Sequence, residues 1–329
     1  MASDEMKAMK VEKIAEYCQR IASEVGKAVI GKQEILLKMM AAFLSSGGHI
    51  LLEDYPGMAK TLIANSFSVA LGLDFKRIQF TPDLLPGDIT GGYIFNNREN
   101  QFVLRKGPLF TNILLADEIN RASPKTQSAL LEAMQENRVS LEGESHLLPD
   151  PFIVMATQNP IEYEGTFPLP EAQLDRFLIR LSVGYPTMAE EKEILTRRSQ
   201  RKLDNVSIES IINPEIFHSM RLGVEEVFID PDLQHYIVQL ISKTRQHKQV
   251  ELGVSPRGSL ALLKLSRSWA AINGRDFVLP DDIKTFAQPA LSHRIILDPN
   301  LWGTKKADTS IIEEILRSTP VPVASTHND

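Results

Sequence analysis

The chain has 329 residues, of which 43% are apolar and 24% charged, a composition typical of a globular protein with two domains or one large one. No apolar run approaches the roughly 20 residues of a membrane-spanning helix, and residues 1–13 lack the apolar core of a signal peptide. The single cysteine, Cys18, excludes an internal disulfide framework and fits a reducing compartment, so we expect a cytoplasmic protein. The net charge of −6 gives no electrostatic case for bulk binding of nucleic acid.

Two helices are predicted before the first strand. Apolar residues recur at helical spacing over residues 11–25, and Gly26 ends this amphipathic pattern. Cys18 lies on the apolar face, where a small buried side chain is a better interpretation than a reactive thiol. A second helix is expected over residues 33–46, just before a pair of glycines.

A buried strand over residues 49–53 leads into a short loop and then into a helix. Strand, tight loop, Lys-Thr and helix is the order of a phosphate-binding loop, whose backbone N–H groups face an anion at the helix N-terminus. In this interpretation Lys60 reaches the β and γ phosphates, and the Thr61 hydroxyl ligates Mg²⁺. Asp54 and Ala59 stand where the usual motif has glycine, and the alternative is a Pro-Gly turn before an ordinary helix.

A strand over residues 75–80, a loop over residues 81–88 and a hairpin over residues 93–104 are predicted next. Basic residues in and beside the hairpin are Arg98, Arg105 and Lys106. A solvated hairpin explains this charge better than a contact with nucleic acid.

Residues 112–117 form an apolar run that ends in two carboxylates, Asp117 and Glu118. Ligands bind beyond the carboxyl ends of parallel strands, so we expect both carboxylates beside the phosphate-binding loop. Adjacent strand positions point in opposite directions, so one carboxylate can hold Mg²⁺ through water while the other takes a proton from the attacking water. The alternative is an acidic cap on the following helix, but that helix has its own start signal in Ser123 and Pro124.

The next buried strand, over residues 152–157, is followed by Asn159. A turn residue is the simple interpretation of this asparagine, but its place after the strand favours a role in orienting water or phosphate. Between the two strands we predict a helix over residues 129–135 and a second hairpin over residues 139–148. A last strand is expected over residues 178–183.

The composition becomes helical after Tyr185 and Pro186. Thr187 begins a capping box, and three later helix starts have a capping residue followed by proline; these are Asn213, Asp230 and Ser255. The residues from Ser318 onward are rich in Pro, Ser and Thr and are predicted to be loose.

These elements predict an α/β protein. A parallel sheet flanked by helices, with inserted β-hairpins, is expected over residues 1–185. A smaller α-helical domain is expected over residues 186–298, and a partly flexible C-terminal extension over residues 299–329.

The order of the parts resembles an AAA+ ATPase and, within that class, the MoxR family. The resemblance covers about residues 11–298 and rests on five segments in order, which are residues 52–61, 115–121, 156–160, 174–177 and 253–257. It implies a P-loop AAA+ domain followed by a helical lid. The first hairpin resembles the helix-2 insert of related ATPases, and the second resembles their pre-sensor hairpin.

The resemblance also implies roles for single residues. The positions that match catalytic or metal-binding positions of the family are Lys60 and Thr61 (Walker A), Asp117 (the Walker B carboxylate on the Mg²⁺ side), Glu118 (the base that polarises water), Asn159 (sensor 1), Arg176 (the arginine finger that reaches a neighbouring subunit) and Arg257 (sensor 2 in the lid). Residues expected to bind the nucleotide are Tyr55, Pro56, Gly57, Met58, Ala59, Lys60, Thr61 and Leu62 in the loop, Val29, Ile30 and Gly31 at adenine, and Asp117 and Arg257.

Each arginine also has a simpler interpretation. Arg176 can pair with a nearby carboxylate, and Arg257 can be an ordinary residue at a helix start. Their places in the order of the family favour the catalytic roles.

The function implied by the resemblance is Mg²⁺-dependent hydrolysis of ATP to ADP at the subunit interfaces of a homo-oligomeric ring, a hexamer. Such a ring remodels or matures a partner protein, often one with a von Willebrand A domain. Two other hypotheses stay open: an ATP-binding switch that hydrolyses little and, less favoured, a DNA-handling motor. The acidic balance and the sparse aromatic residues of the hairpins argue against the motor, so nucleic acid is not an expected partner.

Overall fold

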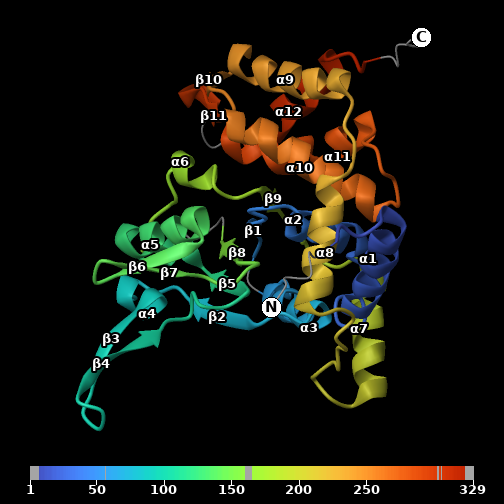
Figure 1. The fold of residues 1–329 in the computed structure, drawn as a ribbon. Helices are drawn as coiled ribbons and strands as arrows, with labels where there is room; N and C mark the ends of the chain where they lie inside the picture. Colours follow the sequence, from blue (N-terminus) through green and yellow to red (C-terminus); the bar gives the residue numbers. More distant parts are fainter. Residues whose placement is uncertain (1–6, 56, 160–164, 302–303, 305, 323–329) are drawn as a thin grey trace.

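The computed structural model describes residues 7–55, 57–159, 165–301, 304 and 306–322. A five-stranded parallel sheet forms the centre of the molecule (Figure 1), in the order β2-β5-β8-β1-β9. Its strands are β1 (Ile50–Glu53), β2 (Phe75–Gln79), β5 (Ile113–Asp117), β8 (Ile153–Gln158) and β9 (Ile179–Leu181). The predicted parallel sheet is confirmed, and its strands differ from the prediction only at their ends.

Helices cover both faces of the sheet, as the apolar strands predict. They include α1 (Val11–Val25), α2 (Gln33–Leu44), α3 (Lys60–Leu71) and α5 (Pro124–Glu136). Ile50 and Leu52 of β1 are buried in the apolar cluster that contains α1, α2 and α3, whereas Leu51 is buried in the cluster that contains α5. This alternation is the two-residue period of a strand. Because both faces are apolar, polar groups collect at the two ends of the strands. The end where the parallel strands begin and the end where they finish are called the two edges of the sheet below.

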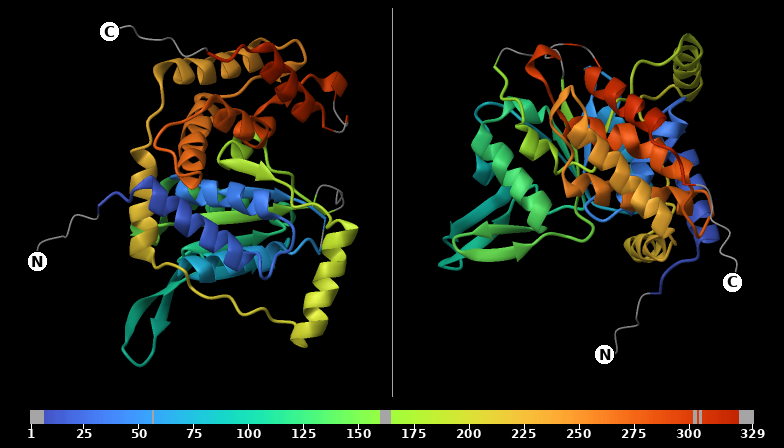
Figure 2. Two further views of the ribbon diagram at one scale, coloured as in Figure 1. Left: turned by 90° about the vertical axis from the view of Figure 1, so that its right-hand side faces the viewer. Right: turned by 90° about the horizontal axis from the view of Figure 1, so that it is seen from above.

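Two hairpins are inserted between the strands of the sheet, as predicted. The first pairs β3 (Gly91–Asn96) with β4 (Gln101–Lys106), and the second pairs β6 (Arg138–Leu141) with β7 (Glu144–Leu147). The β3–β4 hairpin extends away from the body of the molecule (Figures 1 and 2).

The segment before the first hairpin differs from the prediction. The loop expected over residues 81–88 ends earlier, because α4 (Pro86–Thr90) is a short helix. Its first residue is proline, and the Asp88 carboxylate accepts a hydrogen bond from the Leu85 N–H at 2.8 Å. Proline at the first position and an acid in the first turn are helix-start signals. The proline and the aspartate that predict a loop therefore mark the start of a helix here.

The chain after β8 is mostly helical, as predicted. Its helices are α6 (Glu171–Leu174), α7 (Met188–Arg201), α8 (Pro214–Glu225), α9 (Pro231–Gln246), α10 (Pro256–Ile272), α11 (Pro280–Leu291) and α12 (Ala307–Ser318). A small pair, β10 (Val250–Leu252) and β11 (Ile296–Leu297), and the 3-10 helices η1 (Ile119–Arg121), η2 (Ser292–Arg294) and η3 (Pro299–Leu301) complete the described elements. The predicted caps are confirmed, since the side chains of Thr187, Asn213, Asp230 and Ser255 each accept a first-turn N–H.

The helical part shares a buried core with the body. Helices α8 and α10 both contact α1 and α2, and one apolar cluster runs through all four. At this contact the hydroxyls of Ser45 and Ser268 are 2.9 Å apart. Helix α7 has no buried residue and stands at one side of the molecule (Figure 2). The division of the chain into domains after residues 185 and 298 stays a prediction.

Helix α12 is not predicted by the sequence reading, which assigns its residues to a partly flexible extension. Ile311, Ile312 and Ile315 are buried, and the helix contacts α9 and α11. One short apolar stripe beside a Pro- and Ser-rich segment is a weak local signal for a helix. The helix is stabilised mainly by its packing against the rest of the chain. Residues 323–329 of the segment predicted to be loose lie outside the described residues. Within the part of the chain that the structure describes, no helix is long and apolar enough to cross a membrane.

Candidate active site

The loop between β1 and α3 turns sharply into the helix. Gly57 and Ala59 have positive φ angles, 83° and 53°. Glycine adopts this conformation freely, whereas an L-residue there costs roughly 1–2 kcal/mol. Ala59 therefore keeps the backbone shape of the glycine that the motif usually has, with some strain. The unpaired N–H groups of the first turn of α3 follow directly and provide the anion site expected of this motif. Pro56 lies outside the described residues.

The loop itself holds the Lys60 ammonium. Its Nζ donates to the carbonyl oxygens of Asp54 at 2.8 Å and Tyr55 at 3.4 Å. Burial lowers the pKa of Lys60, and the nearby carboxylates of Asp117 and Glu118 oppose this shift. These carbonyls use two of the three N–H donors of the ammonium, which leaves one for a phosphate.

The Asp54 side chain points away from the anion site. Its carboxylate, almost fully buried, accepts hydrogen bonds from Ser182 Oγ at 2.7 Å, from the Val183 N–H at 2.6 Å and from the Gly184 N–H at 3.0 Å. A carboxylate held by three donors beyond the end of β9 does not face bound phosphate. Asp54 therefore fastens the loop to the segment that leads to α7, which explains how the motif accommodates an acid here.

A cavity of about 440 Å³ opens beside this loop at the carboxyl ends of the strands. It is lined by Gly57, Met58, Ala59, Lys60, Thr61, Leu62, Arg77, Gln79, Asp117, Glu118 and Asn159. The structure thus brings together residues 57–62 of the predicted loop, both carboxylates and Asn159, whereas the Tyr55 ring stacks on that of Tyr185 outside this lining. Arg77 and Gln79 are not predicted. Two polar residues at alternate positions near the end of β2 are the signal that would have indicated them.

Asp117 ends β5 and has partners on both carboxylate oxygens. Thr157 Oγ1, on the neighbouring strand β8, donates to Oδ1 at 2.7 Å. Arg77, on the other neighbour β2, donates to Oδ2 from Nη2 at 2.7 Å and from Nε at 3.2 Å. Both adjacent strands of the sheet therefore contribute a contact to this carboxylate.

Glu118 follows the strand in a left-handed backbone conformation, with a φ of 56°. Its N–H donates to Thr157 Oγ1 at 2.8 Å, and its Oε2 accepts from Gln79 Nε2 at 2.7 Å. Arg121 Nε lies 3.0 Å from the same Oε2. A non-glycine residue in this conformation is uncommon and concentrates at functional sites. Glu118 therefore lies just beyond β5 and not on the strand itself, and its carboxylate contacts Gln79 and Arg121, which do not contact that of Asp117. The division of roles between the two carboxylates stays a prediction.

The residues predicted at adenine line a different cavity, of about 520 Å³. Val29, Ile30 and Gly31 form one wall of it, and Arg197 of α7 forms another. Gly31 has a φ of 75°, and a Cβ atom there would lie 1.8 Å from an oxygen of Glu190. Only glycine fits this contact between the first helices and α7, and the proposed role at adenine stays a prediction.

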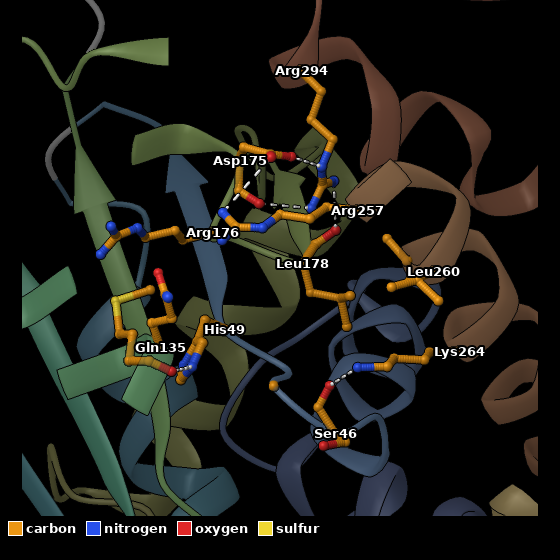
Figure 3. Close-up of a pocket in the computed structure, with 13 residues that line it drawn as sticks. Ser46, His49, Gln135, Asp175, Arg176, Leu178, Arg257, Leu260, Lys264 and Arg294 are labelled. Atoms are coloured by element: carbon orange, nitrogen blue, oxygen red, sulfur yellow. Dashed lines mark hydrogen bonds and ion pairs between the residues drawn. The ribbon is translucent and has the colours of Figure 1, made fainter. Parts of the chain in front are cut away.

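The two predicted arginines lie together in a third cavity, of about 250 Å³ (Figure 3). Arg176 precedes β9, and Arg257 is in the first turn of α10. Lys264 and Arg294 add two more cations, and Asp175 is the only carboxylate in the described lining of this cavity. The cavity is therefore positive and suited to an anionic group.

Asp175 and Arg294 support the turn that carries Arg176. Arg294 Nε donates to Asp175 Oδ1 at 2.8 Å, and its other nitrogens donate to backbone carbonyls that include those of Phe177 at 2.7 Å and Leu178 at 3.1 Å. The Arg294 side chain is 3% exposed. By contrast, Arg176 Nε is buried and has no hydrogen-bond partner among the described residues. Figure 3 shows Arg176 pointing away from Asp175 and Arg294. Arg294 is not predicted from the sequence, because only the fold brings it beside Asp175.

The two groups of residues lie at opposite edges of the sheet. The phosphate loop follows β1, whereas the cavity with Arg176 includes His49, which precedes β1, and Leu178, which precedes β9. The Leu178 N–H donates to the His49 carbonyl at 2.8 Å, so both strands begin side by side there. A strand of four residues spans about 13 Å. One chain therefore does not bring Arg176 to its own phosphate loop.

Comparison with known proteins gives consistent matches. Residues 49–179 match the ATPase family associated with various cellular activities (AAA), and residues 242–315 match the AAA lid domain. The chain is 47% identical to the uncharacterized protein YeaC of Bacillus subtilis (strain 168), over 92% of this chain and 94% of that protein. It is 40% identical to the chaperone MoxR1 of Mycobacterium tuberculosis, over 92% of this chain and 82% of that protein.

A solved structure has the same fold. It is a crystal structure of a protein from Cytophaga hutchinsonii ATCC 33406 assigned as an ATPase, with a TM-score of 0.88 and 39% sequence identity, over 95% of this chain and 97% of that one. The part of the chain that holds the phosphate loop and β5, and the helical part that follows, thus each match a model of AAA proteins. The chain belongs to the MoxR family of AAA proteins and is an ATPase.

Proposed function

We propose that this ATPase works as a homo-oligomeric ring, a hexamer, in which each hydrolysis site is shared by two subunits. The observation that carries the proposal is the separation of the two groups of residues at opposite edges of one sheet. One edge offers a loop for phosphate and two carboxylates. The other offers Arg176, whose buried Nε has no partner among the described residues, in a positive cavity. A head-to-tail contact between identical chains unites two such edges, and repetition of that contact closes a ring.

Lys60, Thr61, Asp117, Glu118 and Asn159 form the first half of the proposed site. The Thr61 hydroxyl and the Asp117 carboxylate would hold Mg²⁺, because they are the hard oxygen donors that this ion prefers beside a nucleotide. Bound there, Mg²⁺ supplies neutralisation of charge on the β and γ phosphates. Lys60 contacts the same phosphates, Glu118 aligns and deprotonates the attacking water, and Asn159 orients it.

The neighbouring subunit supplies the second half. Its Arg176, and with it Arg257, neutralise the charge that grows on the transferred phosphoryl group. Because Arg257 lies in α10, a change in nucleotide state alters the position of the helical part relative to the adjacent subunit. This coupling converts hydrolysis into movement.

The movement serves the remodelling or maturation of a partner protein. Support comes from a relative of 40% identity that is named a chaperone. The β3–β4 hairpin adds a surface for such a client, because the paired rings of Phe95 and Phe102 are 49% and 70% exposed at its end. The base of this hairpin is tied to the second hairpin by the Tyr93 hydroxyl, which donates to Glu144 at 2.6 Å, so the exposed rings lie on a supported element. A cytoplasmic client, such as one with a von Willebrand A domain, is the proposed partner.

Mixing two inactive variants tests the shared site. Lys60→Ala removes the phosphate contact at one edge, and Arg176→Ala removes the arginine at the other. Each alone is expected to lose hydrolysis by at least about a hundredfold. In a one-to-one mixture of subunits, one interface in four combines an intact loop with an intact arginine, so about a quarter of wild-type activity returns. No recovery in mixed assemblies, with assembly verified by light scattering, would overturn the shared site.

A nucleotide-dependent switch is the second candidate. The contacts of Lys60 with loop carbonyls, and of both carboxylates with cations, favour low turnover in the isolated chain. Specific ATPase activity measured across protein concentration separates the two. A rise with assembly supports the ring ATPase, and a low constant value supports the switch.

A further inference from the structure

Arg77 forms an ion pair with Asp117, the carboxylate that is proposed to hold Mg²⁺. Its Nη2 and Nε both donate to Asp117 Oδ2, at 2.7 and 3.2 Å. Nη2 also donates to Gln79 Oε1 at 3.0 Å, and Gln79 Nε2 donates to Glu118 Oε2 at 2.7 Å. One guanidinium thus contacts Asp117 directly and Glu118 through Gln79. Neither contact has a part in the hydrolysis proposed above.

Arg77 has two physically distinct possible roles at Asp117. It orients the carboxylate for the metal, or it competes with the metal for the carboxylate. Orientation is already provided by Thr157, which is completely buried and donates to Asp117 Oδ1 at 2.7 Å. The same hydroxyl oxygen accepts the Glu118 N–H, so it is fixed on both sides. Asp117 therefore keeps its direction without Arg77.

Competition fits the exposure of the pair. The side chain of Arg77 is 46% exposed and that of Asp117 is 14% exposed. Arg77 belongs to β2, an outermost strand of the sheet, and its side chain can move into solvent. A guanidinium and a divalent cation at one carboxylate oxygen repel each other. The arrival of Mg²⁺ at Asp117 is therefore opposed while the ion pair is in place.

We propose that Arg77 occupies the metal side of Asp117 in the nucleotide-free protein and is displaced when Mg²⁺ enters with the nucleotide. The inference rests on the proposed Mg²⁺ role of Asp117. Displacement also removes the contact of Arg77 with Gln79. Glu118 keeps its own contacts with Gln79 and Arg121.

The test measures the Mg²⁺ concentration for half-maximal binding of ADP that carries a fluorescent N-methylanthraniloyl group. Arg77→Gln is expected to lower this concentration by about fivefold, the size of a partly exposed ion pair. Lys76→Gln is the matched control. Lys76 is the adjacent cation on β2, points to the other face, and donates to the Phe110 carbonyl at 3.1 Å. Lys76→Gln removes the same charge from the same strand and is expected to leave the Mg²⁺ requirement nearly unchanged.

A third variant and a second readout complete the test. Thr157→Val removes the orienting hydroxyl and is expected to raise the Mg²⁺ requirement. Binding of Mn²⁺ in the presence of ADP, followed by the loss of its free electron paramagnetic resonance signal, has to show the same order of variants. Arg77→Lys, which keeps the charge but not the two-nitrogen contact, is expected to fall between wild type and Arg77→Gln.

Two outcomes overturn the inference. A higher Mg²⁺ requirement in Arg77→Gln, as in Thr157→Val, shows that Arg77 orients the carboxylate. Equal effects of Arg77→Gln and Lys76→Gln show a general charge effect without a specific contact. The proposed function fails separately if ADP binding by the wild-type protein does not depend on Mg²⁺ at all, and the inference then fails with it.

Discussion

At the edge of the sheet that carries the phosphate loop, the functional side chains bond to one another and are partly exposed. At the opposite edge, the side chains that support Arg176 are buried and carry most of the contacts, while Arg176 Nε has no partner among the described residues. The Arg77–Asp117 and Arg121–Glu118 pairs have arginines that are 46% and 41% exposed, whereas Arg294 beside Asp175 is 3% exposed. The contacts at the first edge are thus open to solvent, whereas those at the second are buried and hold the turn that carries Arg176.

The largest expected effect lies at the edge that carries the phosphate loop. Glu118→Gln is predicted to lower the rate of ATP hydrolysis by roughly 10²–10⁴-fold, because an amide cannot take a proton from water. ATP still binds, since Gln keeps the shape of the side chain and its hydrogen bond with Gln79. The measurement is the single-turnover rate together with equilibrium binding of ATP. Glu142→Gln, an exposed hairpin glutamate whose φ of 49° resembles that of Glu118, is the control and leaves both unchanged. Undiminished hydrolysis would remove Glu118 from its assigned role.

The next effect tests the opposite edge. Arg294→Met is predicted to lower the free energy of unfolding by about 3–5 kcal/mol, because it leaves the Asp175 carboxylate with only the 3.8 Å contact to Arg257 and leaves the Phe177 and Leu178 carbonyls without this donor. Hydrolysis by the assembled protein also falls as the turn with Arg176 relaxes, but nucleotide binding to the single chain is unaffected because the loop is at the other edge. Denaturant unfolding and nucleotide titration check the two parts.

Arg317→Met provides the comparison for this variant. Arg317 is 80% exposed and its Nη2 is 3.2 Å from a Glu313 oxygen, so its loss changes the free energy of unfolding by less than about 0.5 kcal/mol. Equal losses in the two variants, or a loss of nucleotide binding in Arg294→Met, would show that this edge is not held by buried contacts independent of the loop.

The sheet and most helices could be predicted from the sequence because their signals are local. Continuous apolar strands and capping residues, such as Thr187 and Asn213, specify elements without knowledge of the rest of the chain. Helix α12 could not be predicted, since its three buried isoleucines become informative only against α9 and α11. The short helix α4 was missed for another reason, because proline and aspartate mark both loops and helix starts.

The candidate site divides in the same way. Lys60, Asp117, Glu118 and Asn159 follow recognisable strands, so the parallel topology alone places them in one cavity. Arg77 and Asp54 were harder, because the direction of their side chains depends on strands far away in sequence. Asp54 looks unfavourable beside phosphate until the donors Ser182, Val183 and Gly184 are seen to turn it away. The sequence contains these residues, but only the fold shows that they meet.

The smallest of the predicted effects concerns pH and again belongs to the edge that carries Arg176. The His49 side chain is buried. Its Nδ1 accepts the Val154 N–H at 3.1 Å, and its Nε2 donates to the Met134 carbonyl at 3.0 Å. Burial lowers the pKa of His49 to about 4, and the nearby Lys264 ammonium adds to this shift. The imidazole is neutral in the folded chain, while the unfolded chain takes up a proton near pH 6.5. Stability present above pH 6.5 is therefore lost progressively as the pH falls toward 4.

Between pH 6.5 and pH 5 the expected loss from His49 is about 1.5 kcal/mol in the free energy of unfolding. His293, also buried with a lowered pKa, acts in the same direction, so the contribution of His49 has to be isolated by difference. His49→Gln keeps a donor and an acceptor but does not titrate, and its stability is expected to fall less steeply with acid by that amount. Denaturant unfolding of both proteins at the two pH values gives the comparison. Parallel pH profiles would show that the start of β1 opens to solvent and that this edge is less rigid than its buried contacts indicate.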